Sequence, residues 1–488
     1  MRGLHRKILV LLLLPQFLFF VPANQQLKTE IDKLNADTDL SSGSWSLYVI
    51  TADSGKVLAN VNAARSHTPA STLKIFTTAA ALHLLGTEYQ YETVLEYSGT
   101  FDSLSGRISG NLYIRGSGDP TLDSRYFSTP GDSTQLKRWA AALYKKGVRS
   151  IDGAAVADAS AFGGTPLPDG WTWGDMGQYY GAQSSALTWH DNSYSLFYNS
   201  TADTAKLVRT MPVPEGTTLV SQVSAGGSRD EAFVYGAPYG NVQYIRGRIP
   251  AGAVNYEVEA ALPDPALQCA AEFTRTLEKL GIKVKASPAT IRLQEIEGSK
   301  NNAPRKKILA TQSPKLSEII YWTNLKSDNI YAEQLLRTIG FVKGKGGTVE
   351  DGTAAVINFW KQQGIDTKGM FINDGSGLSR SNAVTTQQQA EALRIITKWP
   401  KKEYEAFKRS LPVAGKSGSL ASLCKGSFAE NNLIAKSGYI TRARGYTGYV
   451  KTRSGKLVCF SLLANNYTCT ATEMKKKLER ILIAVAEL

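Results

Sequence analysis

The pattern of apolar and polar residues divides the chain into two ends where helices and strands alternate and a middle rich in β-structure. Two runs of β-branched and aromatic residues flank Asp53-Ser54-Gly55, which predicts a hairpin over residues 44–62. Pro69 and Gly86 bracket an alanine-rich stretch that is typical of a buried helix. Two strands and a helix are predicted near the C-terminus, in LIAKSGYITRARGYTGYVKT, KLVCFSLLANNY and ATEMKKKLERILIAVAEL.

Residues 88–305 have a different pattern. Short β-like runs there are separated by Gly, Asp, Ser and Pro, and helical periodicity is found in STQLKRWAAALYKKG and DPALQCAAEFTRTLEKLG. Helix and strand alternate on both sides of this region, so the pattern predicts an insertion inside an α/β catalytic domain. A chain of 488 residues has room for two to four domains.

The first 23 residues have the features of an export signal. Arg2, Arg6 and Lys7 precede an apolar run of about 14 residues, and small residues follow at 21–23. This run is shorter than the ~20 residues that a membrane-spanning helix needs. We therefore expect a signal peptide over residues 1–23, export to the periplasm or cell-wall space of a bacterium, and no membrane span after cleavage. An uncleaved N-terminal anchor is the alternative.

Charge and cysteine content narrow the environment further. The net charge of +14 favours polyanionic surroundings, and an exported protein meets wall polymer before nucleic acid, so no nucleic-acid partner is expected. Export permits disulfides, but the sequence does not choose a pairing among Cys269, Cys424, Cys459 and Cys469, and we expect Cys269 to be buried in a helix. Neither these cysteines nor the four histidines have ligand spacing, so no metal site is expected.

The candidate chemistry begins at Ser71-Thr72-Leu73-Lys74. A serine hydroxyl is a weak nucleophile until a base takes its proton, and Lys74, three residues on, lies on the same helix face. Positive potential at a helix N-terminus and burial both favour the neutral amine that a base requires. Taken alone the motif is weak, because a capped helix start has the same appearance.

Two later motifs strengthen this interpretation. Ser327-Asp328-Asn329 lies between predicted helices, and Lys436-Ser437-Gly438 begins a predicted strand. In this order the three motifs match the set of penicillin-binding proteins and β-lactamases, with Ser437 in place of the usual threonine. A second Lys-Ser-Gly occurs at Lys416, but the strand-like flanks of Lys436 favour the latter.

The surrounding sequence resembles the D-alanyl-D-alanine carboxypeptidase/endopeptidase family of class C penicillin-binding proteins from about residue 45 to 485. The resemblance rests on TPASTLKIFTTAAALHLLG, GSGDPTL, INDGSGLSRSN and AKSGYI. It implies a β-lactamase/transpeptidase-like catalytic domain, an antiparallel sheet flanked by helices, formed by residues 24–87 and 306–488. It also implies two nested β-rich domains, about 88–160 with 262–305 and about 161–261. The gap of about 256 positions between Ser71 and Ser327 is longer than a β-lactamase has there.

The same resemblance implies a role for each motif residue. Ser71 would be acylated by the penultimate D-alanine carbonyl, with Lys74 as general base. Ser327 and Lys436 would pass the proton to the leaving amine, and Asn329 would bond the substrate amide. Substrate-binding positions would be Ser437, Gly438 and Tyr439, and the backbone N–H groups of Ser71 and Tyr439 would form the oxyanion hole. Peptidoglycan peptides are the implied substrates and β-lactams the implied inhibitors, without metal or organic cofactor.

Several alternatives stay open in the sequence. The family usually has a small hydroxyl residue where Tyr439 stands, and that hydroxyl helps to bind the substrate's terminal carboxylate, so tyrosine favours endopeptidase action or reduced activity. A catalytically weak protein that only binds wall peptides or penicillins is the alternative function. The aromatic segment 169–182 is interpreted as local packing rather than as a glycan platform. The sequence does not give the oligomeric state.

Overall fold

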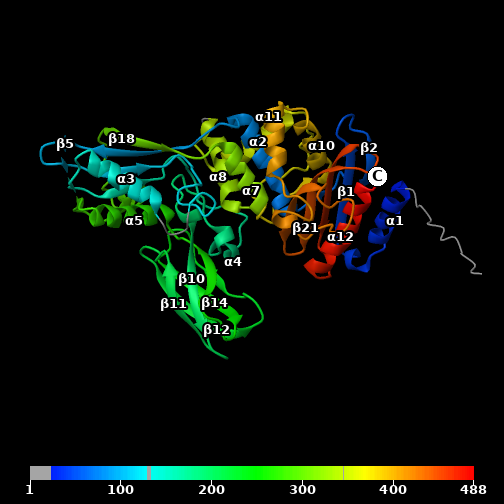
Figure 1. Ribbon diagram of the computed structural model, residues 1–488, viewed down its shortest axis with the longest axis horizontal. Coiled ribbons are helices and arrows are strands. Elements are labelled where there is room, and N and C mark those ends of the chain that lie inside the picture. The colour runs from blue at the N-terminus through cyan, green and yellow to red at the C-terminus, as the bar shows by residue number, and fades with distance from the viewer. Residues whose placement is uncertain (1–22, 129–132, 344–345) are drawn as a thin grey trace, which may run out of the picture.

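The computed structural model describes residues 23–128, 133–343 and 346–488 (Figure 1). The predicted signal peptide lies outside the described residues except for Ala23, where helix α1 (Ala23–Asn35) begins. Within the described ranges, no helix is both long and apolar enough to cross a membrane.

A five-stranded antiparallel sheet forms the centre of the larger lobe. The strands run in the order β2 (Val57–Val61), β1 (Ser44–Thr51), β22 (Leu457–Asn465), β21 (Ala443–Lys451) and β20 (Ile434–Ile440). The predicted hairpin over 44–62 and the predicted strand KLVCFSLLANNY are thereby confirmed. The strand predicted for LIAKSGYITRARGYTGYVKT is instead two strands, β20 and β21, which pair antiparallel. Strand β20 is at the edge of the sheet, and its outer side is paired only at its start, where Ile434 bridges to Val413 and Ala435 donates to the Pro412 carbonyl.

Side chains alternate between the two faces of this sheet, and both faces are buried. Leu47 and Val49 pack on the side of α1 and α12 (Ala471–Ala486), whereas Tyr48 and Ile50 belong to the core on the opposite side. Figure 1 shows α1 and α12 together beyond one face of the sheet and the remaining helices beyond the other. Burial on both faces explains why these strands are apolar almost throughout.

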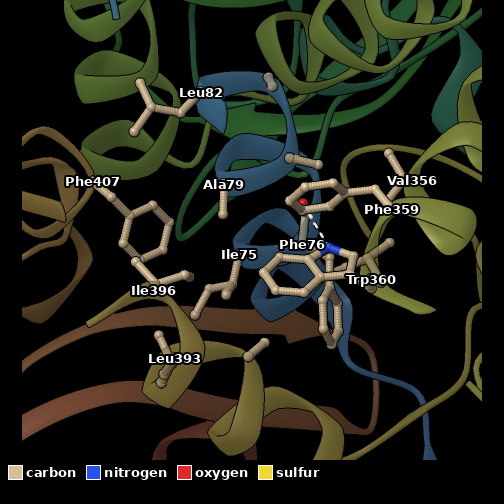
Figure 2. Close-up of a cluster of buried hydrophobic side chains, with 14 of the residues drawn as sticks. Ile75, Phe76, Ala79, Leu82, Val356, Phe359, Trp360, Leu393, Ile396 and Phe407 are labelled. Atoms are coloured by element: carbon tan, nitrogen blue, oxygen red, sulfur yellow. Dashed lines mark hydrogen bonds between the residues drawn. The ribbon is translucent and has the colours of Figure 1, made fainter. Parts of the chain in front are cut away.

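Helix α2 (Lys74–Leu85) lies inside the helical layer on the second face. It ends at Gly86, whose φ of 89° confirms the predicted stop. Figure 2 shows how its apolar residues meet side chains from α9 (Val349–Gln362), α10 (Thr386–Ile396) and α11 (Lys401–Ser410), and the Trp360 indole donates a hydrogen bond of 3.2 Å to the Phe76 carbonyl. Helices α7 (Leu316–Lys326) and α8 (Asn329–Val342) also contact α2. This packing fixes the position of the side chains at the start of α2.

The chain between α2 and α7 forms two further lobes, which Figure 1 shows on the other side of α8 from the main sheet. The first contains α3 (Thr134–Lys145), α5 (Pro265–Lys279), α6 (Ile291–Ile296) and two sheets. One sheet has the order β17 (Ala289–Thr290), β9 (Ala155–Asp158), β7 (Leu112–Arg115), β4 (Glu92–Ser98) and β18 (Arg305–Gln312). The other has the order β16 (Lys283–Val284), β8 (Ser150–Ile151), β6 (Arg107–Ile108) and β5 (Phe101–Asp102). Because β18 pairs with β4 along its length, this sheet extends past the predicted boundary at residue 305 to Gln312.

The second lobe carries two three-stranded sheets and projects away from the rest in Figure 1. One has the order β11 (Ala205–Met211), β10 (Ser193–Ser200) and β15 (Tyr256–Ala261). The other has the order β12 (Thr218–Gly227), β14 (Val242–Pro250) and β13 (Phe233–Tyr235). Short segments complete the lobes: α4 (Trp173–Met176) and the 3₁₀ turns η3 (Tyr179–Gly181) and η4 (His190–Asn192).

Mixed helices and sheets with inserted lobes agree with the predicted α/β class. The four cysteines all carry free thiols, and Cys269 is buried on α5 as expected. The disulfides that export permits are therefore not formed in this structure.

Candidate active site

Ser71 and Lys74 lie where the chain enters α2. Ser71 is in a 3₁₀ turn, η2 (Ala70–Leu73), and Lys74 is the first residue of the α-helix, so the helix begins slightly later than the sequence suggested. In a 3₁₀ turn, side chains three residues apart eclipse one another, which aligns the two groups. The Lys74 amine lies 3.0 Å from the Ser71 hydroxyl oxygen.

Lys74 is fully buried and its amine makes two further hydrogen bonds. It donates to Asn329 Oδ1 at 2.6 Å and to the Ser376 carbonyl at 2.7 Å. Burial lowers the pKa of Lys74 to about 8, although the carboxylates of Asp374 and Glu333 act in the opposite direction. A substantial neutral fraction near physiological pH makes this amine a suitable proton acceptor for the Ser71 hydroxyl.

The second motif forms the junction between α7 and α8. Ser327 ends α7 in the left-handed conformation with a φ of 62°, and Asp328 caps α8 by accepting the backbone N–H of Tyr331. Asn329 is the first residue of α8, and its amide nitrogen donates to the Tyr180 carbonyl at 2.8 Å. The tight junction places Ser327 and Asn329 on the same cleft as Ser71.

The third motif lies on the edge strand β20. The buried Lys436 amine donates to Ser327 Oγ and to the Ser437 carbonyl, both at 2.8 Å. Burial and the nearby Lys74 hold the pKa of Lys436 well below its usual range. Lys416 is exposed and lies in the loop before η5 (Gly418–Leu420).

The outer edge of β20 presents backbone donors to the cleft. The N–H of Ala435 bonds to the Pro412 carbonyl, away from β21, and alternate residues of a strand point the same way, so the N–H of Tyr439 also faces outward. A Cβ on Gly438 would lie 2.5 Å from the Pro69 carbonyl oxygen and 3.1 Å from the Ser71 nitrogen. Glycine is therefore required for β20 to approach the Ser71 backbone.

Ser437, the remaining predicted substrate-binding residue, lies on the same strand. Its hydroxyl donates to Ser419 Oγ at 2.7 Å. The structure thus brings all three motifs together around Ser71, with the Lys416 loop contributing Ser419 beside them.

The segment INDGSGLSRSN, residues 372–382, forms a loop that supports the site, a role that the sequence did not indicate. Asp374 accepts hydrogen bonds from the Trp171 indole and the backbone N–H groups of Gly377 and Ser379 at 2.6–2.9 Å. Gly377 has a φ of 85°, and a Cβ there would lie 1.9 Å from the Ala70 carbonyl oxygen. The loop therefore packs directly against the turn that carries the Ser71 hydroxyl.

Glu333 is a second buried carboxylate that the sequence reasoning missed. It accepts the backbone N–H groups of Gly375 and Ser376 at 2.8–3.0 Å, and burial raises its pKa. Glu333 follows Asn329 by four residues on α8, so the two lie on one helix face. This spacing was the signal that could have identified it.

The motif residues open into a cavity of about 560 Å³. Ser71, Ser327, Asn329 and Tyr439 line it, and the segment 169–182 supplies further wall residues, Asp175, Tyr179 and Tyr180. The packing interpretation of that segment holds for the buried Trp171, but its second half belongs to the cleft. The Tyr439 side chain is 54% exposed at the rim, with the Arg444 guanidinium 5.4 Å from its ring centre.

Comparison with known proteins decides the family. The model of the D-Ala-D-Ala carboxypeptidase 3 (S13) family matches residues 27–486. The chain belongs to this family. The family predicted from the sequence motifs is confirmed, and so is the predicted enzyme class, a serine-type hydrolase.

Individual members support the assignment of this S13 peptidase. It is 30% identical over 467 residues to a D-alanyl-D-alanine carboxypeptidase of Actinomadura sp., covering 91% of this chain and 81% of the relative. It is 27% identical to a D-alanyl-D-alanine carboxypeptidase of Haemophilus influenzae, covering 86% of this chain and 85% of the relative. The crystal structure of penicillin binding protein 4 from H. influenzae has the same fold, with a TM-score of 0.77 at 23% identity over 94% of this chain and 98% of that chain.

Proposed function

We propose that this S13 peptidase hydrolyses peptidoglycan stem peptides ending in D-alanyl-D-alanine through an acyl-enzyme on Ser71. The observation that carries the proposal is the buried Lys74 amine, 3.0 Å from the Ser71 hydroxyl and with a lowered pKa. A neutral amine at hydrogen-bonding distance is what a serine nucleophile needs when no histidine is beside it.

In acylation, Lys74 accepts the Ser71 proton while the serine oxygen attacks the carbonyl of the penultimate residue. Negative charge develops on that carbonyl oxygen, and the backbone N–H groups of Ser71 and Tyr439 are the donors that would bind it. The contact between Gly438 and the Ser71 backbone supports this pairing, because it holds the two donors on neighbouring walls of the cleft.

Departure of the terminal D-alanine requires a proton on its nitrogen. Lys436 and Ser327 form a hydrogen-bonded pair at 2.8 Å, and Ser327 lines the cleft together with Ser71, which supports their role in passing the proton that Lys74 took from Ser71 on to this nitrogen. Asn329 bonds to the Lys74 amine and lines the cleft, so it is placed to orient both the base and a substrate amide. Attack of water on the ester then returns the Ser71 hydroxyl.

We also infer that β-lactams acylate Ser71. Penicillin binding protein 4 of H. influenzae has been crystallised with a β-lactam, and this chain shares its fold. An enzyme of this specificity works outside the cytoplasmic membrane, in agreement with the predicted signal peptide and periplasmic or wall location.

Tyr439 favours cleavage of cross-links over removal of a free terminal residue. Its exposed ring occupies the rim of the cleft at the position where the family has a small hydroxyl group. A cross-linked substrate continues beyond the cleaved bond and does not need a carboxylate contact at that point. The second candidate function, a penicillin-binding protein with little turnover, is favoured by the same residue.

Covalent labelling by a fluorescent penicillin tests the proposal. The chain from residue 24 to 488 is compared with Ser71→Ala, Lys436→Ala and Lys416→Ala. We expect a stable adduct that Ser71→Ala abolishes and Lys436→Ala slows at least tenfold, while the exposed Lys416→Ala has no effect. A folded wild-type protein without an adduct would refute the acyl-enzyme proposal.

The two peptidase activities are separated by comparing the rates at which the enzyme hydrolyses two substrates. A cross-linked peptide dimer measures endopeptidase activity, and a pentapeptide ending in D-alanyl-D-alanine measures carboxypeptidase activity.

A further inference from the structure

The projecting lobe carries aromatic side chains on the outer face of its second sheet. Strand β13 pairs with β14, and the register places Tyr235 opposite Tyr244. Two residues away, Phe233 lies opposite Arg246. Side chains alternate along a strand, so these four residues share one face, whereas Val234 between them is buried in the core of the lobe. Phe233 is 44% exposed and Tyr244 is 41% exposed, which is typical of a surface that binds something.

Trp173, on α4, extends this row of rings. Its indole is stacked on the Tyr235 ring, with ring centres 6.4 Å apart and planes 29° apart. Trp173 is 54% exposed, whereas the other seven tryptophans of the chain are buried or half-buried. Exposing so large an apolar side chain beside other exposed rings is unfavourable unless a ligand covers it. The following residues are together called the aromatic stripe: Trp173, Tyr235, Tyr244, Phe233 and Arg246.

The aromatic stripe is joined to the wall of the Ser71 cleft through α4. Asp175 on α4 and two tyrosines of η3 line the cleft, and α4 contacts both η3 and β13. Gln178 Nε2 donates to the Val234 carbonyl at 3.1 Å, and a Cβ on Gly177 would lie 2.1 Å from the same oxygen. Figure 1 shows α4 where the projecting lobe meets the rest of the molecule. A polymer with one of its side chains in the cleft can therefore continue along the stripe.

Arg246 supplies hydrogen-bond donors in the middle of the stripe. Its guanidinium carbon lies 5.5 Å from the centre of the Tyr244 ring, and its Nε donates to Gln222 Oε1 at 2.8 Å. No carboxylate within the described part of the chain forms an ion pair with this guanidinium, so its terminal nitrogens can donate to a ligand. Arg248, two residues further on, lies on the same face of β14.

Flat aromatic rings beside hydrogen-bond donors suit a chain of N-acetylated amino sugars. The C–H groups on one side of a sugar ring pack against an aromatic face, and the acetamido carbonyl accepts a hydrogen bond from an arginine. A chain of this kind is also the polymer to which the stem peptides of the proposed substrate are attached.

We propose that the aromatic stripe binds the glycan strand of peptidoglycan while one of its stem peptides occupies the Ser71 cleft. The inference rests on the proposed function for the peptide. It departs from the sequence-based interpretation of segment 169–182 as local packing, because Trp173 of that segment is exposed and belongs to a row of exposed rings. The glycan strand would then hold successive stem peptides near the nucleophile.

Oligosaccharides without peptide test the stripe independently of catalysis. The probes are the trimer and the hexamer of N-acetylglucosamine, with the glucose hexamer, which lacks acetamido groups, as the control. Calorimetry measures Kd for the chain from residue 24 to 488. We expect the N-acetylglucosamine hexamer to bind about tenfold more tightly than the trimer, because it reaches more of the rings, and more tightly than the glucose hexamer. Absence of binding, or equal binding of the two hexamers, would refute the proposal.

Matched variants locate the sugar. Tyr244→Ala and Trp173→Ala each remove a ring of the stripe, and Tyr144→Ala removes a 43% exposed ring of α3 in the other inserted lobe. The Kd for the hexamer should rise about fivefold in the first two variants and stay unchanged in Tyr144→Ala. Because Tyr244 lies on a sheet surface away from the cleft, its variant tests the stripe even where Trp173→Ala disturbs α4. A wild-type dimer that Tyr244→Ala dissociates in sedimentation velocity would make this face a contact between copies and overturn the proposal.

Failure of the proposed function is separable from failure of this inference. Penicillin labelling of Ser71 involves no glycan, so Tyr244→Ala should be labelled at the wild-type rate. Its kcat/KM should fall about fivefold for stem peptides attached to glycan strands and stay unchanged for the free pentapeptide. Absence of labelling in the wild type refutes the acyl-enzyme, whereas normal labelling without sugar binding refutes the glycan surface.

Discussion

The pH dependence of acylation follows from the state of Lys74. Burial gives this lysine a pKa of about 8 against its ordinary 10.5, so about one-tenth of the molecules carry the neutral amine at pH 7 and half at pH 8. If neutral Lys74 takes the Ser71 proton, the second-order rate constant for penicillin acylation should rise about fivefold from pH 7 to 8. A further rise of about twofold should complete the profile by pH 9.

Stopped-flow labelling with a fluorescent penicillin between pH 6 and 9.5 measures this profile, with circular dichroism to establish that the protein stays folded. Lys74→Arg is the matched control, because a guanidinium keeps its proton throughout this range. We expect its rate constant to fall at least a thousandfold and to lose the rising limb. A wild-type rate constant that is flat or decreasing from pH 6 to 8 would refute Lys74 as the base.

The same shift makes Lys74 a pH-dependent cost to stability. Its folded pKa is below the unfolded value, so the unfolded chain binds more protons between pH 8 and 10.5, and stability rises with pH in this window. The cost at neutral pH is of order 3 kcal/mol. Urea unfolding of Lys74→Met and wild type at several pH values should therefore show the difference moving in favour of the wild type above pH 8. A pH-independent difference would mean that the lysine titrates normally.

Two further predictions concern the support of the site, and a third concerns the cysteine thiols. Gly377→Ala should lower the free energy of unfolding by at least about 2 kcal/mol and the rate constant of penicillin acylation at least tenfold, because the added Cβ would meet the Ala70 carbonyl. An unchanged melting temperature and an unchanged labelling rate would contradict this. Trp171→Phe loses the indole bond to Asp374 and should cost about 1–3 kcal/mol in urea unfolding, whereas no loss would mean that the bond is dispensable. Of the four free thiols only Cys469 is partly exposed, so a thiol reagent should modify one thiol in the native protein and four after unfolding. Modification of two or more thiols in the native protein would show that the buried thiols are accessible.

Local features of the site were readable from the sequence. Ser71 and Lys74 are three residues apart, and a single turn of helix is enough to bring them together, so their contact needed no knowledge of the fold. Likewise, the hairpin over 44–62 and the strand that carries Lys436 followed from alternation and turn residues. The association of the three motifs came from resemblance to a family, because nothing local links residues hundreds of positions apart.

The tertiary structure alone decided the electrostatics of the candidate active site. The pKa of Lys74 depends on complete burial and on carboxylates from α8 and from the loop at Asp374, and neither can be read from its own neighbours in sequence. Burial and long-range charge are properties of packed surfaces, so only the folded chain defines them.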